Sequence, residues 1–255
     1  MRSALIGYTG FVGSTLAATE PFDVKINRSN LDELRGGSFD RIVCAGLPAA
    51  KWLANRDPEA DAANMRTLMD ALSDVAAARF VLISTIDVYT QTSGADEDFD
   101  CRSQPNHAYG AHRLQFEEFV RERFPEATIV RLPALFGQGL RKNVLYDLLN
   151  DNCLEMINPE SSFQWYPLER LSRDLATIEK VGLRLVNLFP EPLQTRTILE
   201  RFFPRKPVGG KPTAAAAYDL YTRHARAFGS SGRYMMSRGD VLAAMERFIG
   251  EANAK

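Results

Sequence analysis

The stretch Ala4-Leu5-Ile6-Gly7-Tyr8-Thr9-Gly10-Phe11-Val12-Gly13 decides the fold of this chain. Three apolar residues lead into a glycine, two further glycines follow at three-residue spacing, and a run suited to a helix begins at Ser14. This order predicts a buried strand, a tight turn and a helix start, the construction that binds a dinucleotide pyrophosphate. Gly7 would permit the sharp turn, and Gly10 would let the backbone approach the phosphates. Gly13 would let the helix pack closely on the strand.

The composition is that of an ordinary globular protein. Of its 255 residues, 45% are hydrophobic and 25% charged, so the chain can bury one large core or two modest ones. Lysine plus arginine (31) nearly balances aspartate plus glutamate (32), which argues against a general binder of polyanions or membrane surfaces. The cysteines suggest no disulfide framework and no metal-ligand spacing; they are Cys44, Cys101 and Cys153. Without a signal peptide or a membrane-length apolar run, we expect a cytoplasmic protein.

Strand-like apolar segments alternate with helical patterns after the glycine turn. Strands are predicted over residues 22–27, 40–45, 79–84 and 128–132, and helices over residues 58–77 and 108–124. Nearly all these strands are continuously apolar, which indicates a parallel sheet covered on both faces. The fold class is therefore α/β, a Rossmann-type doubly wound parallel sheet.

The pattern becomes less regular beyond Gly137. Helices are predicted over residues 144–149, 171–181 and 238–249, and a strand over residues 183–188. Five prolines interrupt the region between residues 190 and 212. We therefore expect a Rossmann domain over residues 1–190, with a substrate-side excursion near residues 138–165, and a small C-terminal substrate-side lobe over residues 191–255.

The end of the second strand bears on the choice of nicotinamide cofactor. An NAD site usually has an acid there to hold the ribose 2′-hydroxyl. This sequence has none, and Arg28 follows Asn27 instead. A guanidinium suits a 2′-phosphate, which favours NADP over NAD. Arg28 could also be a solvated loop residue.

Two further segments carry groups suited to proton transfer. The fourth strand ends in Ser84-Thr85, which places two hydroxyls at the edge of the sheet where ligands bind. Tyr109 and Arg113 lie one turn apart on a predicted helix. A fixed cation beside a phenol lowers the tyrosine pKa, which favours a proton-transfer catalyst.

These features resemble the extended short-chain dehydrogenases/reductases, the family of sugar-nucleotide epimerases, dehydratases and ketoreductases. The shared marks are the Gly7–Gly13 turn, Ser84-Thr85-x-x-Val88-Tyr89, Tyr109-x-x-x-Arg113 and Arg131–Gly137. The resemblance implies that Thr85 binds the substrate oxygen and that Tyr109 is the general acid/base. The cofactor-binding residues would be Gly7, Gly10, Phe11, Val12, Gly13, Asn27, Arg28, Ala45, Gly46, Tyr109, Arg113 and Pro133. The substrate would contact Thr85, Asp87 and Asn143, and a homodimer would form through the Pro58 and Tyr109 helices.

One position departs from the family. Its lysine four residues after the tyrosine, which holds the nicotinamide ribose and lowers the tyrosine pKa, is Arg113 here. Arginine keeps the charge but is longer and planar. Arg113 could substitute for the lysine, shift the cofactor slightly or impair catalysis.

Other candidates leave alternatives open. Asp87 is either a catalytic acid or a capping acid, and the missing acid at Ile86 argues against dehydration. The run Phe163–Leu168 would stack a sugar or base, or pack in a core. We expect His112 at the surface, and His107, His112 and His224 suggest no metal site.

Two functional hypotheses follow. The first is an NADP-dependent ketoreductase, or alternatively an epimerase, that acts on a nucleotide-linked sugar. The second is a binding or sensing protein that uses the same nucleotide pocket without turnover, which the arginine at position 113 favours. Neither hypothesis involves nucleic acid or a membrane.

Overall fold

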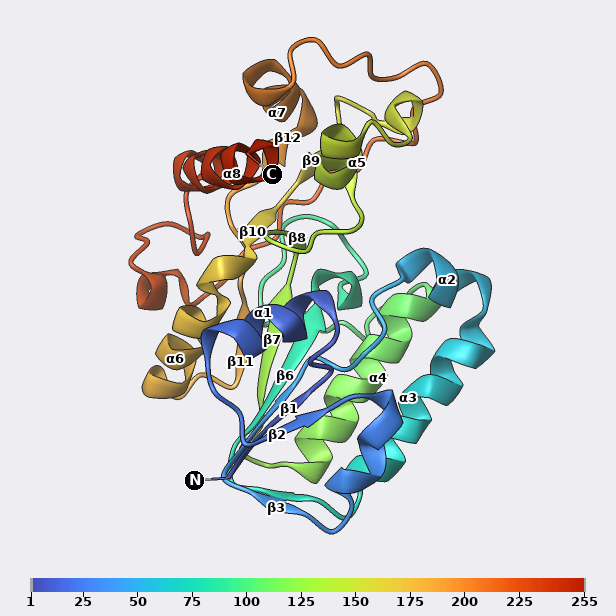
Figure 1. Cartoon of the computed structure of the whole chain (residues 1–255), viewed down its shortest axis with the longest axis vertical. Coiled ribbons are helices and arrows are strands. Elements are labelled where there is room, and N and C mark those ends of the chain that lie inside the picture. Colours follow the sequence, from blue (N-terminus) through green and yellow to red (C-terminus); the bar gives the residue numbers. More distant parts are fainter. Residues whose placement is uncertain (1, 255) are drawn as a thin grey trace. The chain divides into compact units, whose positions relative to one another are not determined.

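The computed structural model describes residues 2–254, which pack into two compact units (Figure 1). Unit 1 contains the residues up to Thr90, Phe99–Arg131 and Ile178–Val186. Unit 2 contains Gln91–Asp98, Leu132–Thr177 and the residues from Asn187 onward. The boundary predicted at residue 190 stays a prediction.

A six-stranded sheet of order β11-β7-β6-β4-β1-β2 organises unit 1. Its strands are β1 (Ser3–Ile6), β2 (Val24–Ile26), β4 (Arg41–Cys44), β6 (Phe80–Thr85), β7 (Thr128–Leu132) and β11 (Leu185–Asn187). β1 pairs in parallel with β2 on one side and with β4 on the other, so that Ala4 faces both Val24 and Ile42. The strand order therefore reverses between β1 and β4, which is where ligands bind in open α/β sheets.

Helices α3 (Pro58–Leu72) and α4 (Ala108–Arg123) lie side by side and pack on this sheet (Figure 1). Alternate strand residues point into the core that these helices close; they are Ala4, Ile6, Ile42, Cys44, Phe80, Leu82 and Ile129. The intervening residues Leu5, Val43 and Val81 are equally buried. Both faces of the sheet are therefore covered, as the continuously apolar strands predict.

The remaining elements of unit 1 are short apart from the first helix. They are α1 (Phe11–Thr19), η1 (Arg28–Leu34), α2 (Lys51–Arg56) and η2 (Ile86–Val88). The helix predicted over residues 58–77 is wrong at its end, because α3 stops at Leu72 and β5 (Ala76–Ala77) pairs with β3 (Ser38–Phe39). This pairing with a distant segment removes those residues from the helix.

Unit 2 contains small two-stranded ladders and several helices. Its strands are β8 (Ala134–Phe136), β9 (Ser162–Phe163), β10 (Trp165–Pro167) and β12 (Leu193–Gln194). Its helical elements are α5 (Val144–Asn150), η3 (Leu154–Met156), η4 (Leu168–Arg170), α7 (Thr195–Phe202), η5 (Ala225–Phe228) and α8 (Arg238–Asn253); α6 (Leu171–Val181) begins here and ends in unit 1. Trp165 and Tyr166 are at most 1% exposed, so this part of the aromatic run packs in the core of unit 2.

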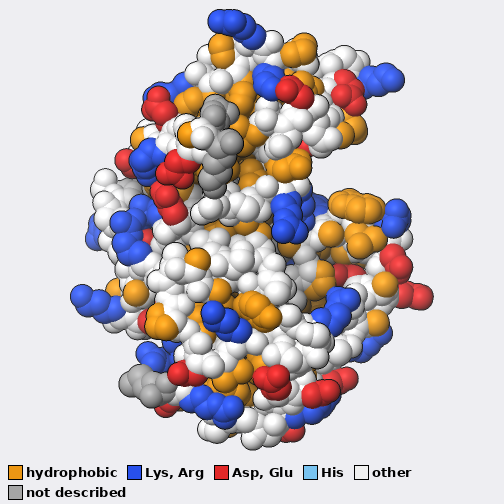
Figure 2. Space-filling view, viewed as in Figure 1, with side chains coloured by type: hydrophobic (Ala, Val, Ile, Leu, Met, Phe, Trp, Pro, Cys, Tyr) orange, Lys and Arg blue, Asp and Glu red, His pale blue; other side chains and the backbone are white. Residues whose placement is uncertain are grey.

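Cationic and anionic side chains are interspersed over most of the face drawn in Figure 2. That pattern agrees with the balanced composition. Among the residues described, no helix is both long and apolar enough to cross a membrane.

Candidate active site

The glycine-rich turn joins β1 to α1 at the carboxyl edge of the sheet. Gly7 has a φ of 84°, and a Cβ atom added to it would lie 2.4 Å from the carbonyl oxygen of Ala45. A Cβ atom on Gly13 would lie 2.1 Å from the Gly7 carbonyl oxygen. Gly10 is the N-cap of α1; no side chain caps this helix, and its first turn contains no acid. Among the described residues, no side chain thus occupies the N–H groups of this helix end, which suits a phosphate-binding turn.

The chain leaving β4 packs against this turn. The Ala45 N–H donates to the Ile6 carbonyl oxygen at 2.9 Å, and a Cβ atom on Gly46 would lie 2.9 Å from Cγ2 of Ile6. Phe11 and Val12 are half-buried in the first turn of α1. The predicted cofactor residues around β1 and β4 thus meet at one edge of the sheet.

Asn27 and Arg28 follow β2. The Asn27 side chain donates to the Tyr8 hydroxyl at 3.3 Å and accepts from the Ser29 N–H at 2.8 Å, so it caps η1. Arg28 is exposed, and within residues 2–254 its side chain makes no hydrogen bond or ion pair. Its guanidinium is therefore accessible, while its selection of a 2′-phosphate stays a prediction.

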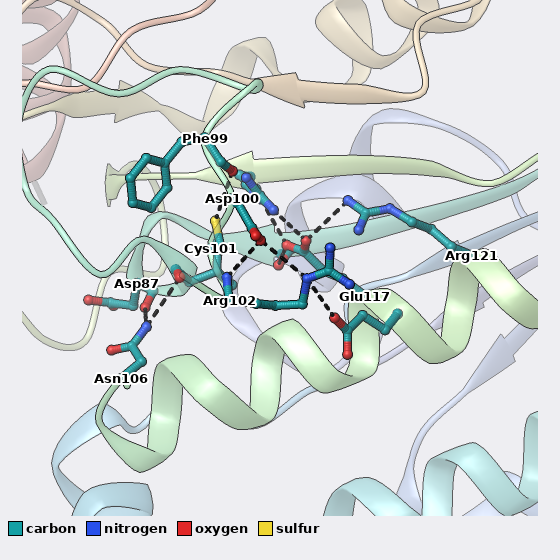
Figure 3. Close-up of polar contacts among 12 residues, drawn as sticks. Asp87, Phe99, Asp100, Cys101, Arg102, Asn106, Glu117 and Arg121 are labelled. Atoms are coloured by element: carbon teal, nitrogen blue, oxygen red, sulfur yellow. Dashed lines mark hydrogen bonds and ion pairs between the residues drawn. The ribbon is translucent and has the colours of Figure 1, made fainter. Parts of the chain in front are cut away.

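Thr85 and Tyr109 meet because α4 begins against η2. The Asn106 side-chain amide donates to the Asp87 carbonyl oxygen at 2.9 Å (Figure 3). A Cβ atom on Gly110 would lie 2.2 Å from that same carbonyl oxygen, so the close approach requires glycine. Thr85 is half-buried at the end of β6, and it lies close enough to Tyr109 for its hydroxyl to lower the tyrosine pKa.

Burial sets the proton affinity of Tyr109, which is 7% exposed. Desolvation is the largest influence on its pKa and raises it above the ordinary value. The Arg113 charge and the nearby Thr85 hydroxyl lower that pKa, whereas Asp87 and Asp61 raise it. The lowered tyrosine pKa expected from the sequence is therefore wrong, because burial outweighs the cation, and the phenol is protonated at neutral pH.

Arg113 is locked against α3. Its side chain is 2% exposed, and its guanidinium carbon lies 4.3 Å from the centre of the Tyr109 ring. Nη1 donates to Oδ2 of Asp61 at 2.7 Å, and Nη2 donates to Oδ1 at 2.9 Å and to the Pro48 carbonyl oxygen at 2.5 Å. Its Nε atom is buried and has no hydrogen-bond partner among the described residues. Asp61 thus offsets the positive charge, and one buried donor of the guanidinium is unused.

His112 shares the Asp61 carboxylate. Its side chain is 18% exposed, and its Nδ1 lies 2.8 Å from Oδ2 of Asp61. The prediction that His112 is a surface residue is wrong, because Asp61 draws it toward α3. Burial raises the Asp61 pKa, but hydrogen bonds from Arg113 and His112 outweigh burial and hold this pKa below its ordinary value.

Asp87 faces α2 as well as Thr85. Its Oδ1 lies 2.5 Å from Nζ of Lys51, and its Oδ2 accepts from the Thr85 hydroxyl at 3.4 Å. Nε2 of His107 lies 3.9 Å from Oδ1 of Asp87. Burial and the nearby Lys51 lower the His107 pKa, while Asp87 opposes them. The hydroxyl edge of β6 therefore carries a cation and an anion that neutralise each other.

A buried ion pair anchors the strand end that carries Thr85. Glu117 on α4 is fully buried and accepts from the Ser84 hydroxyl at 2.6 Å and from Nε and Nη2 of Arg131 at 3.0 and 2.7 Å. Nη2 of Arg121 approaches the same carboxylate at 3.5 Å (Figure 3). The Ser84 hydroxyl therefore has a structural partner, and Thr85 supplies the other hydroxyl at the carboxyl end of β6.

Two predicted residues lie in unit 2. Pro133 is buried between β7 and β8. The Asn143 side chain caps α5 by accepting from the Leu145 and Tyr146 N–H groups, and it donates to the Leu135 carbonyl oxygen at 2.8 Å. Its amide is therefore occupied by structural contacts, and its contact with a substrate diphosphate stays a prediction.

Sequence reasoning missed Asp61 and Lys51. Asp61 lies on the buried stripe of α3 with Met65, Leu68 and Leu72, and an acid at such a position is a signal of a buried partner. Lys51 gave no comparable signal. The described residues contain no group of three or more His, Cys, Asp or Glu side chains that could hold a metal ion.

Comparison with known families gives one match. Residues 27–155 match the NAD dependent epimerase/dehydratase family. No functionally curated protein matches the sequence.

Several solved structures share the fold along nearly the whole chain. A dTDP-glucose 4,6-dehydratase from Streptomyces venezuelae, a double mutant with NAD bound, is 19% identical, with 98% of this chain and 97% of that chain covered and a TM-score of 0.71. A dTDP-4-dehydrorhamnose reductase from Clostridium acetobutylicum is 15% identical, with 99% and 100% covered and a TM-score of 0.73. A UDP-glucuronic acid 4-epimerase from Bacillus cereus, bound to UDP-glucuronic acid and NAD, is 16% identical, with 98% and 99% covered and a TM-score of 0.73.

Proposed function

Because the chain belongs to the NAD dependent epimerase/dehydratase family, we propose that it is an NADP-dependent ketoreductase acting on a nucleotide-linked sugar. Members of this family are enzymes of the extended short-chain dehydrogenase/reductase type. The observation that carries the proposal is the meeting of Thr85 and Tyr109 at the carboxyl edge of the sheet that also carries the glycine turn. The reductase among the similar structures supports the same class of substrate.

The residues present fit a dinucleotide. No described side chain caps the helix that follows the turn from Gly7 to Gly13, and the buried Nε of Arg113 is a donor that a ligand hydroxyl would satisfy. Arg28 would face a 2′-phosphate, and the residues after β4 would line the adenosine side. When bound, the nicotinamide would supply the hydride for reduction.

Tyr109 acts as the acid in this proposal. Its raised pKa keeps the phenol protonated at neutral pH, which is the state that donates a proton to the oxygen formed when a ketone accepts hydride. Thr85 polarises the same oxygen through its hydroxyl. An epimerase also has to begin by removing a proton, so the raised pKa favours reduction over epimerisation.

Dehydration fits the site less well. Asp87 is paired with Lys51, and the preceding position is Ile86, so a pair of acids is missing at the end of β6. We therefore keep epimerisation, and not dehydration, as the alternative reaction.

One observation favours a binding or sensing protein as a second candidate. Asp61 neutralises Arg113, which stands at the position where the family resemblance implies a lysine that lowers the tyrosine pKa. Such a protein would hold the dinucleotide without turnover.

The first experiment measures cofactor binding through nicotinamide fluorescence. The proposal expects tighter binding of NADPH than of NADH, and Arg28→Ala should abolish that preference. Lys25→Ala is the matched control, since it removes an exposed cation from β2. Equal binding of both cofactors by the wild type would contradict the role of Arg28, and binding of neither would contradict the dinucleotide site.

The second experiment measures NADPH oxidation with nucleotide-linked keto sugars. Tyr109→Phe and Thr85→Val should each lose most of the rate, while Thr67→Val on the exposed face of α3 should not. Dinucleotide binding with no turnover above Tyr109→Phe would support the second candidate.

Assembly and location complete the proposal. The family resemblance favours a cytoplasmic homodimer formed through α3 and α4. Sedimentation at several protein concentrations tests the dimer, and a monomer throughout would contradict it.

A further inference from the structure

Arg113, the cation beside Tyr109, is held in one orientation by its hydrogen bonds. The Arg113 guanidinium donates three hydrogen bonds, and one carboxylate accepts two of them, so the plane of the group cannot rotate without breaking both. Asp61 is 6% exposed, and the Arg113 side chain is 2% exposed. The pair is therefore buried and almost free of solvent screening.

We propose that Asp61 is a positioning residue: it fixes the Arg113 guanidinium over the Tyr109 ring and balances its charge, so that the acid of this site works beside a neutral pair and not beside a free cation. This inference rests on the proposed function for its catalytic meaning. Its physical content, the effect of Asp61 on Tyr109, stands on the contacts among three buried side chains.

The charges around Tyr109 define what Asp61 changes. Titratable and charged groups face Tyr109 or its charged neighbours from every element packed there: Arg113 and His112 from α4, Asp61 from α3, Asp87 from η2, Lys51 from α2, and His107 just before α4. Lys51 lies against Asp87, so that pair is also neutral. Loss of the Asp61 charge would leave Arg113 as the uncompensated cation in contact with the phenol ring.

The experiment titrates the tyrosinate absorbance of Tyr109, which requires neither cofactor nor substrate. The signal of Tyr109 is the difference between each variant and the same variant with Tyr109→Phe. In Asp61→Asn the Tyr109 midpoint should move to lower pH, because the unbalanced guanidinium stabilises the phenolate. Asp70→Asn, which removes an exposed acid from the same helix, should leave the midpoint unchanged.

A second variant separates charge balance from loosened packing. Asp61→Asn/Arg113→Met removes both charges, and its midpoint should return to the wild-type value or above it, because burial remains and the cation is gone. A midpoint that stays low in this double variant would show that Asp61 acts through packing alone and would overturn the inference. An unchanged midpoint in Asp61→Asn would overturn it as well.

The proposal stays testable if Asp61→Asn does not fold. Arg113→Gln keeps Asp61 and removes the cation, so the Tyr109 midpoint should rise. A fall or no change would contradict the inference. If the midpoints move as expected while the wild type does not reduce keto sugars, the proposed function fails and the role of Asp61 in setting the protonation of Tyr109 stands.

Discussion

Replacing Glu117 with glutamine tests the ion pair that anchors the Thr85 end of β6. The carboxylate is fully buried and receives two hydrogen bonds from Arg131, which is itself 2% exposed. Burial alone would lower the Arg131 pKa, but Glu117 outweighs burial and raises it. Glu117→Gln leaves this guanidinium buried without a counter-charge, which costs about 3–5 kcal/mol. For a chain of this size, that loss corresponds to a fall in Tm of roughly 6–20 °C.

Urea unfolding followed by circular dichroism measures the free energy of unfolding of each variant. Glu122→Gln, an exposed acid on the same helix, should change it by less than about 0.5 kcal/mol. The variant Glu117→Leu/Arg131→Met/Ser84→Ala removes the carboxylate together with its two buried partners and should recover most of the loss, because the remaining partner, Arg121, is 42% exposed and stays solvated. A loss below about 1 kcal/mol in Glu117→Gln would refute the reasoning. So would a triple variant as unstable as the single one.

Three further predictions concern the site. Gly13→Ala places a Cβ atom 2.1 Å from a backbone oxygen and should abolish dinucleotide binding, as fluorescence titration would reveal; wild-type affinity would contradict the tight turn. Gly110→Ala clashes at 2.2 Å with the backbone of η2 and should lower turnover far more than dinucleotide affinity, a split that steady-state kinetics and binding would check. The Asp61 pKa is lowered by folding, so its contribution to stability is full above the unfolded pKa of about 3.9 and is lost as pH falls through the folded value. The stability difference between wild type and Asp61→Asn should therefore shrink on acidification below about pH 4, and a difference independent of pH would contradict this assignment.

The sheet could be predicted from the sequence because each of its main strands is a short, continuous apolar segment. Residues such as Leu5, Val43 and Val81 continue the apolar runs on both faces, which happens when helices cover both sides. The end of α3 could not be predicted from the local sequence. Ala76–Ala77 form a strand because they pair with Ser38–Phe39, a segment that is distant in the sequence.

The site was predictable where a residue type is required locally. The glycine turn and the hydroxyl at Thr85 follow from short patterns. The environment of Tyr109 could not be predicted from the sequence, since its raised pKa reflects burial by several elements. Asp61 and Arg113 are 52 residues apart, so only the folded chain brings the acid to the guanidinium. An acid on the buried stripe of α3, Asp61, did indicate a buried partner. The aromatic run near Trp165 contained no feature that distinguishes a ligand-stacking role from packing in the core.

The most direct test of the proposed ketoreductase follows the hydride itself. NADPH with deuterium at the transferable position is incubated with a nucleotide-linked keto sugar, and the product is analysed by mass spectrometry for wild type and Tyr109→Phe. The account predicts deuterium on the new carbinol carbon with the wild type and almost none with Tyr109→Phe. Recovery of the keto sugar without a labelled alcohol would contradict reduction. Epimerisation of the corresponding alcohol sugar in the presence of NADP+, with no net oxidation, would instead identify an epimerase, because an epimerase returns the hydride that it has itself removed. Equal labelling by both proteins would contradict Tyr109 as the acid.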